Sequence, residues 1–574
     1  MPIKATHQHP LTRRNFMQGS GFAGGLLLSS GMHSLLSSCS PQPSTTKIPE
    51  QNTVARTPNP QFIPDLEINL QAAPKTVQIL AGEMTQVWSY AATLVKGDPN
   101  SLQAIPDSYL GPIIRVQTGQ RVRVNFQNNL PQGQSSIVHW HGLILPEDMD
   151  GHPRFAIEPG QIYVYEFEVI NRAGMNWFHP HPDMLTGQQA YAGLAGLFIV
   201  TDPEEVALKL PSGTYEVPIV LQDRTLDTNN QLLYLGSKLG TPRNSGMGDM
   251  GGMGGMNNSD RSGSGMGDMS SMMGFLGQQI FVNGKPNFTL AAATRVYRLR
   301  ILNGSNARIY KLGWSNGDPL TVIGTDGSLL TQPVTRKYVM LAPGERIDVW
   351  ADFTKLKVGT EISIDSLVFS GAENAGGSNM GGMMNSNNAP ELGTAMMLFK
   401  VKIDRSETEA LRLPTKLAAL PLLRPEDAIN VAQPRPVELS LQGMKWVMNG
   451  QLFEMNAATP QETVQLNSIE QWEIINKLNP GVMMDAKGMA HPIHFHGVKF
   501  QVISRQVLPE LAAGWQTVKD GYVDEGFKDT VMVMPGERVK LLMKFEKYSG
   551  LFAYHCHTLE HEDAGMMRNY RVIG

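Results

Sequence analysis

The chain has 574 residues, with 48 lysines and arginines against 52 aspartates and glutamates, so its formal net charge is −4 at pH 7. This length exceeds one ordinary domain, and at roughly 150 residues per domain it predicts three or four. The slightly acidic balance gives no reason to expect a basic surface of the kind that binds nucleic acid, so no nucleic-acid partner is expected.

Residues 1–39 are predicted to be an export signal that takes no part in the fold. Arg13 and Arg14 precede a moderately apolar, glycine-rich stretch from Gly21 to Leu36, which resembles a twin-arginine signal peptide. This apolar run is short and broken by glycine, which disfavours a membrane-spanning helix. The twin-arginine export machinery is therefore a predicted partner.

The leader ends in Leu36-Ser37-Ser38-Cys39, which resembles a lipobox. Two outcomes stay open: a lipid on Cys39 anchors the chain to a membrane, or the leader is cleaved and the chain is released. Both predict an exported protein, in the bacterial periplasm or on the outer face of the membrane. Residues 40–64 follow as a linker.

Two His-x-His pairs come next, His139 with His141 and His179 with His181. In a strand, residues two apart lie on one face and about 6.5 Å from each other along the chain. This spacing suits two neighbouring metal ions. A single pair is more often a hydrogen-bonded coincidence, so the prediction depends on how many such pairs the chain has.

Two low-complexity inserts, at about 243–275 and 372–393, interrupt the middle of the chain. The first contains Met247, Met250, Met253, Met256, Met266, Met269, Met272 and Met273, and the second Met380, Met383 and Met384. Glycine at this density cannot hold a helix or a core, so a flexible linker is one interpretation. Thioether sulfur selects Cu(I), and we favour capture of cuprous ions.

The last part of the chain carries the remaining histidines, His491, His494, His496, His555, His557 and His561, together with Cys556 and Met566. A thiolate, two imidazoles and a thioether are the ligand set of a blue copper centre. In a strand, the side chain of Cys556 points away from the face that holds His555 and His557. The strand would thus join two metal centres through a short covalent path.

Of the 14 histidines, three lie in the leader and ten in these clusters. The one left over, His152, is predicted to be an ordinary surface or loop histidine. With Cys39 in the leader and Cys556 at the metal site, the mature chain would contain no disulfide.

A repeated pattern indicates the fold class. Pro159, Pro343 and Pro535 are each followed by glycine and open an alternating apolar segment, and a similar segment precedes each of them at 122–130, 296–303 and 464–476. Short strand patterns that recur with Gly and Pro punctuation predict a repeated β-unit. We predict an all-β protein with three cupredoxin-like Greek-key β-barrel domains, at 65–203, 204–405 and 406–574.

With these motifs the chain resembles the three-domain multicopper oxidases, which include laccases, bilirubin oxidases and bacterial cuprous oxidases. The resemblance extends from about residue 65 to the end. It implies four copper ions, one of type 1, one of type 2 and two of type 3, and no other cofactor. The implied type 1 ligands are His491, Cys556, His561 and Met566. Those of type 2 are His139 and His494, and those of type 3 are His141, His179, His181, His496, His555 and His557.

The resemblance further implies that Asp150 and Glu562 deliver protons near the trinuclear site, although hydrogen-bonded carboxylates without a proton role remain an alternative. It implies one-electron oxidation of a small reductant at type 1 and four-electron reduction of O₂ to water. Met489 matches a methionine of the substrate site of cuprous oxidases. Lys487 replaces the acidic residue expected there, and Asp485 is a candidate substitute.

The favoured donor is Cu(I), which would serve copper tolerance. One alternative is a laccase-like oxidase of phenols or other organic donors. Another is a protein that sequesters Cu(I) without turnover.

Overall fold

The computed structural model describes residues 56–235, 237–238, 272–372, 389–443, 445–478 and 488–574. The predicted leader with Cys39, most of both methionine-rich inserts, Lys487 and Asp485 lie outside these residues. Among the described residues, no helix combines the length and apolar character needed to cross a membrane.

A first pair of sheets spans residues 66–201, with strand orders β2-β1-β5-β7 and β3-β4-β9-β8-β6. Buried and half-buried side chains alternate along β5, as expected for a strand with one face on a core. The strands are β1 (Leu66–Val77), β2 (Thr85–Lys96), β3 (Leu102–Gln103), β4 (Ile113–Gln117), β5 (Arg121–Asn128), β6 (Val138–His139), β7 (Ile162–Glu168), β8 (Gly174–Pro180) and β9 (Gly196–Thr201).

A second pair spans residues 216–405, with strand orders β14-β13-β10-β16-β21-β18-β19 and β15-β23-β22-β17-β20. Strands β11 (Leu233–Tyr234) and β12 (Ser237–Lys238) form a separate hairpin. The remaining strands are β10 (Glu216–Arg224), β13 (Gln279–Val282), β14 (Lys285–Pro286), β15 (Thr289–Ala293), β16 (Val296–Asn303), β17 (Tyr310–Trp314), β18 (Leu320–Thr325), β19 (Ser328–Arg336), β20 (Val339–Leu341), β21 (Arg346–Asp352), β22 (Glu361–Ser366) and β23 (Met396–Arg405).

A third pair spans residues 435–573, with strand orders β25-β24-β27-β31-β29 and β26-β33-β32-β28-β30. The strands are β24 (Arg435–Gln442), β25 (Lys445–Met448), β26 (Thr463–Gln465), β27 (Ile469–Asn476), β28 (His491–Phe495), β29 (Phe500–Val507), β30 (Thr530–Val533), β31 (Glu537–Lys544), β32 (Gly550–Cys556) and β33 (Met567–Ile573). The α-helices are short: α1 (Thr186–Ala192), α2 (Pro203–Ala207), α5 (Ala512–Gln516) and α6 (Leu559–Asp563).

The same pairing recurs in all three pairs of sheets. In each, a first strand runs parallel to a second, which is antiparallel to a third: β1-β5-β7, β10-β16-β21 and β24-β27-β31. The second and third strands of these sets match the repeated segments of the sequence. This confirms the predicted all-β fold with three cupredoxin-like Greek-key units. The domain boundaries stay predictions, and each pair of sheets lies within one predicted range.

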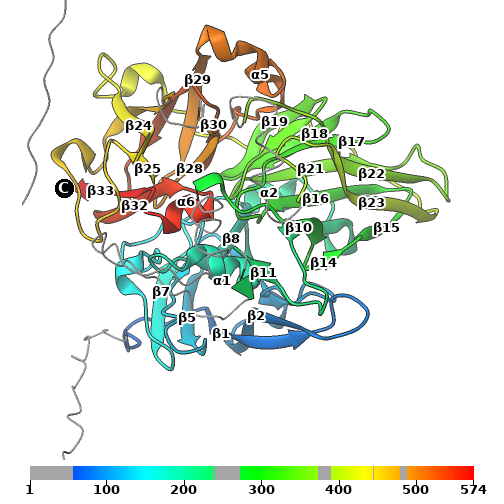
Figure 1. The fold of residues 1–574 in the computed structure, drawn as a ribbon. Coiled ribbons are helices and arrows are strands. Elements are labelled where there is room, and N and C mark those ends of the chain that lie inside the picture. Colours follow the sequence, from blue (N-terminus) through cyan, green and yellow to red (C-terminus); the bar gives the residue numbers. More distant parts are fainter. Residues whose placement is uncertain (1–55, 236, 239–271, 373–388, 444, 479–487) are drawn as a thin grey trace, which may run out of the picture. The chain divides into compact units, whose positions relative to one another are not determined.

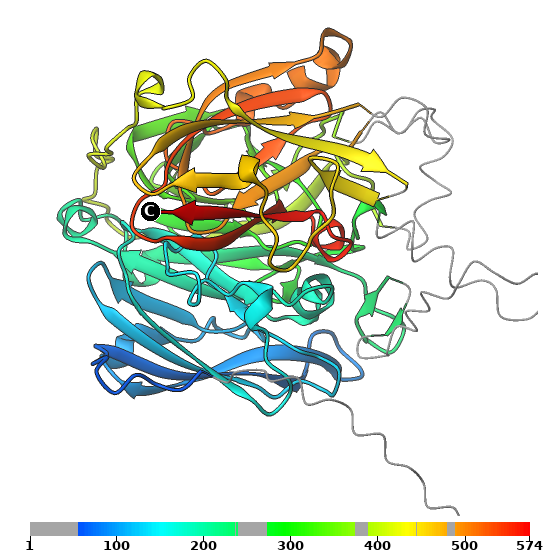
Figure 2. The same ribbon diagram turned by 90° about the vertical axis from the view of Figure 1, so that its left-hand side faces the viewer.

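The first and last parts of the chain meet where the histidines lie. In both views the red C-terminal segment with β32 and α6 runs beside the cyan-to-green segment around β8 and α1 (Figures 1 and 2). Hydrogen bonds join them, because Asp563 in α6 accepts from the backbone N–H groups of Thr186 and Gly187, both at 2.9 Å.

Candidate metal centres

The cysteine cluster consists of His491, Cys556 and His561, whose potential ligand atoms lie within 4.8 Å of one another. Cys556 Sγ is 3.4 Å from His491 Nδ1 and 3.6 Å from His561 Nδ1. All three side chains are fully buried. Met566 lies in the same apolar core, and its backbone carbonyl accepts a hydrogen bond from the Cys556 backbone N–H.

The chemistry of this cluster fits a soft metal ion. Burial raises the pKa of the Cys556 thiol to about 12, so the sulfur keeps its proton unless a nearby cation offsets the cost of the charge. A thiolate, two imidazoles and a thioether are the donors that copper prefers in blue sites. The residues present therefore fit a copper ion.

Eight further histidines gather in three groups, two of which share His141. Antiparallel pairing of β28 with β32 sets His494 opposite His555, and pairing of β6 with β8 sets His139 opposite His179. The groups are His139, His141 and His494; His141, His179 and His557; and His181, His496 and His555.

Imidazole lone pairs converge within these groups. His139 Nε2 is 3.3 Å from His494 Nε2, and His555 Nε2 is 3.3 Å from His181 Nε2 and 3.1 Å from His496 Nε2. His139 Nδ1 donates to the Asp150 carbonyl at 2.7 Å, and His494 Nδ1 donates to the Asp529 carbonyl at 2.8 Å. With the proton on Nδ1, the facing Nε2 atoms are both acceptors, and a cation near them removes their repulsion.

Burial favours the neutral form of His139, His181 and His494. It lowers the pKa of His181 to about 4 and the pKa values of His139 and His494 well below their usual range. Neutral imidazole is the form that binds metal. In addition, His179 Nε2 and both ring nitrogens of His557 are buried without a hydrogen-bond partner among the described residues. The histidine groups therefore fit metal ions as well.

The two predicted proton-delivery carboxylates lie against these histidines. Asp150 Oδ2 accepts from His496 Nδ1 at 2.6 Å. Glu562, in α6, has Oε2 at 3.0 Å from His555 Nδ1 and Oε1 at 3.5 Å from His181 Nε2. Both side chains are almost fully buried.

Two residues at the cysteine cluster were not expected to contact it. The Met272 carbonyl accepts from His561 Nε2 at 2.8 Å and from Trp446 Nε1 at 2.9 Å. The Trp446 ring stands edge-on to His491, with 4.5 Å between ring centroids. Met489 is buried in the same apolar core as Cys556. The structure therefore places both Met272, near the end of the first insert, and Met489 in the apolar core that contains Cys556.

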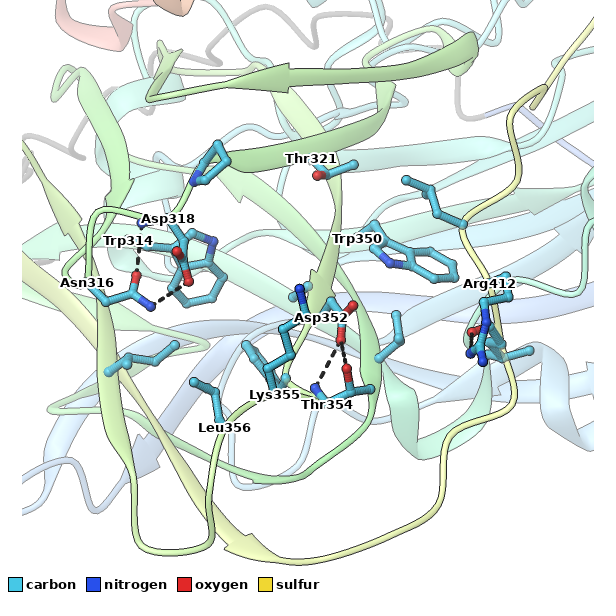
Figure 3. A pocket seen from close by; sticks show the side chains of 17 residues that line it. Trp314, Asn316, Asp318, Thr321, Trp350, Asp352, Thr354, Lys355, Leu356 and Arg412 are labelled. Atoms are coloured by element: carbon cyan, nitrogen blue, oxygen red, sulfur yellow. Dashed lines mark hydrogen bonds between the residues drawn. The ribbon is translucent and has the colours of Figure 1, made fainter.

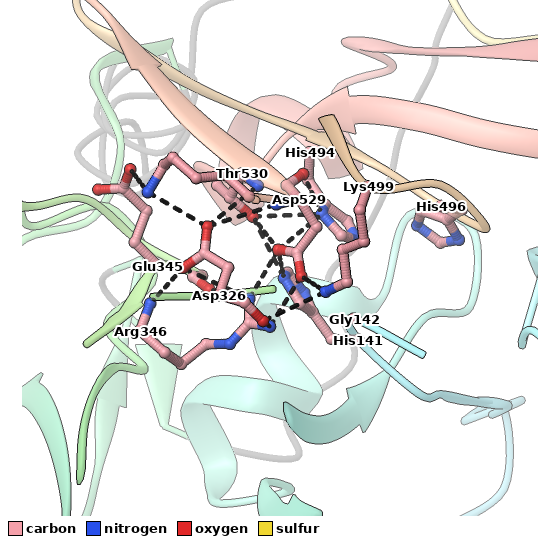
Figure 4. Close-up of polar contacts among 12 residues, drawn as sticks. His141, Gly142, Asp326, Glu345, Arg346, His494, His496, Lys499, Asp529 and Thr530 are labelled. Carbon is pink, nitrogen blue, oxygen red and sulfur yellow. Dashed lines mark hydrogen bonds and ion pairs between the residues drawn. The ribbon is translucent and has the colours of Figure 1, made fainter. Parts of the chain in front are cut away.

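Asp529 was also missed by the sequence analysis. It precedes β30, and Figure 4 shows it between His141 and the buried charged side chains of Asp326, Arg346 and Lys499. The sequence does contain one signal for Asp529: a charged residue stands directly before a short apolar run, which forms the fully buried strand β30. Nothing in the local sequence linked it to a histidine.

His152 was predicted to be a surface or loop histidine, and it lies in a loop but not at the surface. This side chain is fully buried, and its Nε2 lies 2.9 Å from Asn569 Oδ1. Its Nδ1 accepts from the Arg154 backbone N–H at 3.2 Å. It occupies a loop, where it joins distant segments of the chain and takes no part in the histidine groups.

A cavity of about 660 Å³ lies in the second pair of sheets, well separated in sequence from the histidines (Figure 3). Trp314 and Trp350 line it. Its carboxylates are engaged locally, since Asp318 accepts from Asn316 at 2.7 Å and Asp352 accepts from the Thr354 hydroxyl at 2.6 Å. We assign no ligand to this cavity.

Comparisons with known proteins agree on one family. Models of the family described as "Multicopper oxidase" match residues 87–205 and 430–573. A laccase of Bacillus subtilis is 31% identical over 510 residues, which cover 82% of this chain and 90% of the laccase. A bilirubin oxidase of Albifimbria verrucaria is 28% identical over 470 residues, covering 80% of this chain and 71% of that protein.

The fold has solved counterparts as well. The crystal structure of the McoA multicopper oxidase from Aquifex aeolicus superposes with a TM-score of 0.68 at 29% identity, covering 89% of this chain and 97% of that one. Together with the copper-compatible histidine and cysteine groups, these similarities show that the chain belongs to the multicopper oxidase family.

Proposed function

We propose that this enzyme couples the one-electron oxidation of a donor at the cysteine cluster to the four-electron reduction of O₂ to water at the histidine groups. The supporting observation is that β32 ends in Cys556 beside His491 and His561, while His555 and His557 belong to the histidine groups. Bound copper would supply the one-electron redox chemistry.

Four copper ions are proposed. His491, Cys556, His561 and Met566 would hold the type 1 ion, and His139 and His494 the type 2 ion. The two type 3 ions would be held by His141, His179, His181, His496, His555 and His557.

The surrounding residues orient the imidazoles and supply protons. Hydrogen bonds to Nδ1 leave Nε2 of His139, His494, His496 and His555 free of a proton. Asp150 Oδ1 is buried without a hydrogen-bond partner among the described residues. We propose that this oxygen and the carboxylate of Glu562 hold protons for the reduction of O₂.

We propose Cu(I) as the donor. The imidazoles of His491 and His561 are fully buried, and Met272 and Trp446 occupy their outer edges. A phenol therefore has no direct contact with either ring. Met272 lies near the end of an insert with eight methionines, whose thioethers suit Cu(I).

Oxidation of organic donors is the second candidate, because relatives named laccase and bilirubin oxidase match most of the chain. The test replaces the eight methionines from Met247 to Met273 with leucine and measures O₂ uptake with Cu(I), Fe(II), Mn(II) and a phenol. The control replaces Met84 and Met397, two exposed methionines outside both inserts, with leucine.

For a Cu(I) oxidase, the kcat/KM for Cu(I) falls at least tenfold in the first variant, while that for the phenol does not fall. Unchanged cuprous kinetics would favour the organic donor. Cu(I) binding without O₂ uptake by the unmodified protein would indicate sequestration.

We also propose export through the twin-arginine route to the periplasm or the outer face of the membrane, where the enzyme serves copper tolerance. The support is the sequence of the leader. Replacing Arg13 and Arg14 with lysine should leave the protein in the cytoplasm, and mass spectrometry of the mature N-terminus would separate a lipidated Cys39 from simple cleavage.

A further inference from the structure

Asp529 lies in a buried cluster of charges that joins the middle and last parts of the chain (Figure 4). Arg346 clamps it with two hydrogen bonds, from Nη1 to Oδ1 at 2.6 Å and from Nη2 to Oδ2 at 2.7 Å. Lys499 Nζ donates to Oδ2 at 2.5 Å. Each of these side chains is at least nine-tenths buried. Two cations on one carboxylate hold it as an ionised acceptor.

The same carboxylate forms a hydrogen bond with one histidine of the metal groups, His141, and its Oδ1 lies 3.6 Å from Nδ1 of another, His494. Asp529 Oδ1 is 3.1 Å from His141 Nε2. An ionised carboxylate can only accept a hydrogen bond, so the proton of the neutral imidazole resides on Nε2. His141 Nδ1, which then carries the lone pair, is buried without a hydrogen-bond partner among the described residues.

This orientation is opposite to that of neighbouring histidines. In His139, His494, His496 and His555, Nδ1 faces an oxygen of the protein and Nε2 faces another imidazole. The sequence contains no sign of the difference, because His141 stands in a His-x-His pair like the others.

We propose that Asp529 is a positioning residue, which fixes the proton of His141 on Nε2 and so leaves Nδ1 as the metal-binding atom. This inference rests on the proposed copper-binding function of the histidine groups. Arg346 belongs to the middle part of the chain, which supplies no predicted metal ligand. Through its hydrogen bonds to Asp529, this part of the chain nevertheless helps to orient His141.

Packing around Arg346 restricts the position of the guanidinium group that binds Asp529. Its Nε donates to the carbonyl of Met175, in the strand β8 that leads to His179, at 3.1 Å. A Cβ atom on Gly142, next to His141, would lie 2.5 Å from Arg346 Nη2. Only glycine fits there, so the guanidinium can pack against the backbone beside His141.

The decisive variant is Asp529→Asn. Its amide has one oxygen. The side that faces Lys499 Nζ and Arg346 Nη2 has two cationic donors, whereas the side that faces His141 has one, Arg346 Nη1, so the first side attracts that oxygen more strongly. The amide N–H group should then donate to His141 Nε2, which moves the imidazole proton to Nδ1. The matched control is Asp326→Asn, in the same buried cluster. Asp326 accepts from the backbone N–H groups of Arg346, at 2.7 Å, and Asp529, at 3.4 Å, and it contacts no histidine side chain among the described residues.

Two measurements test the proposal on the full chain. Nitrogen-15 NMR of histidine-labelled, metal-free protein, with the His141 signal assigned by its loss in His141→Gln, reports which ring nitrogen carries the proton. We expect Nε2 in the unmodified protein and in Asp326→Asn, and Nδ1 in Asp529→Asn. Titration with copper against a chelator should show an affinity about 10- to 100-fold weaker for the histidine groups of Asp529→Asn.

The visible thiolate-to-copper absorption of Cys556 serves as an internal control for folding and should persist in both variants. If Asp529→Asn does not fold, Arg346→Lys, which keeps the charge but removes the paired hydrogen bonds to Asp529, should also weaken copper binding.

A proton on Nδ1 of His141 in the unmodified protein would overturn the proposal. Equal copper affinity in Asp529→Asn and Asp326→Asn would overturn it too. If the unmodified protein binds no copper, the proposed function fails, whereas the metal-free NMR result still tests the role of Asp529.

Discussion

His561 donates a hydrogen bond from Nε2 to the carbonyl oxygen of Met272, 2.8 Å away. The ring atom on the far side of the imidazole, Nδ1, faces the sulfur of Cys556. One imidazole thus connects the proposed type 1 site to the end of the methionine-rich insert. Because Trp446 donates to the same carbonyl, the position of Met272 depends on two hydrogen bonds.

Replacing Trp446 with phenylalanine should loosen this contact. The change keeps an aromatic ring against His491 but removes the Nε1 donor, which contributes about 1 kcal/mol. We expect the kcat/KM for a phenol to rise about fivefold and that for Cu(I) to fall. Trp515→Phe is the control, since the Trp515 indole donates to Glu537 and contacts none of the described residues of the cysteine cluster. Equal donor preference in both variants would contradict the proposed role of Met272.

Glu562→Gln should slow the delivery of protons. The amide keeps the size of the side chain at His555 but cannot release a proton, and loss of a positioned acid typically costs at least about a hundredfold in rate. Stopped-flow measurements should find a slower reoxidation by O₂. Reduction of the cysteine centre by donor in the absence of O₂ is the internal control and should keep its rate. A variant in which both rates fall equally would argue for a structural role.

Glu216 predicts how stability depends on pH. Burial alone would raise the pKa of this carboxyl, but Arg300 and Arg115 lower it from the ordinary 4.5 to about 2. The folded state therefore binds this proton less tightly than the unfolded state. The resulting stabilisation is complete above about pH 4.5 and disappears as the pH falls towards about 2.

Glu216→Gln should consequently lower the free energy of unfolding by about 1–3 kcal/mol at pH 7, because Arg300 loses one charged hydrogen-bond partner and keeps Glu205 and Asp348. Urea unfolding at several pH values would show the difference from the unmodified protein shrinking below about pH 4.5. Glu361→Gln, in the exposed pair with Lys402, should change stability by less than about 1 kcal/mol. A difference that stays constant with pH would contradict this account of Glu216.

The sequence was sufficient to predict the fold because its signals are local. Alternating apolar residues and the Pro-Gly pairs at 159, 343 and 535 mark the strands that recur as β5-β7, β16-β21 and β27-β31. The histidines of each single motif likewise stand close together in the chain, as in His139-Trp140-His141 and His555-Cys556-His557, and the resemblance to multicopper oxidases implied how the motifs combine.

Contacts across the fold could not be anticipated. The partner of His152 is Asn569, and that of His141 is Asp529, each hundreds of residues away. Which ring nitrogen of a histidine points inward depends on such a partner, and no spacing in the sequence reports it. The role of Met272 also depends on its backbone carbonyl rather than on its sulfur.

The central claim is that Cys556 binds copper and passes electrons to the groups that contain His555 and His557. The most direct test is the visible absorption and O₂ uptake of the copper-loaded protein beside its Cys556→Ser variant. We predict an intense blue absorption and O₂ uptake in the unmodified protein, and the loss of both in the variant. A colourless unmodified protein, or a variant that keeps its colour and its O₂ uptake, would contradict the account.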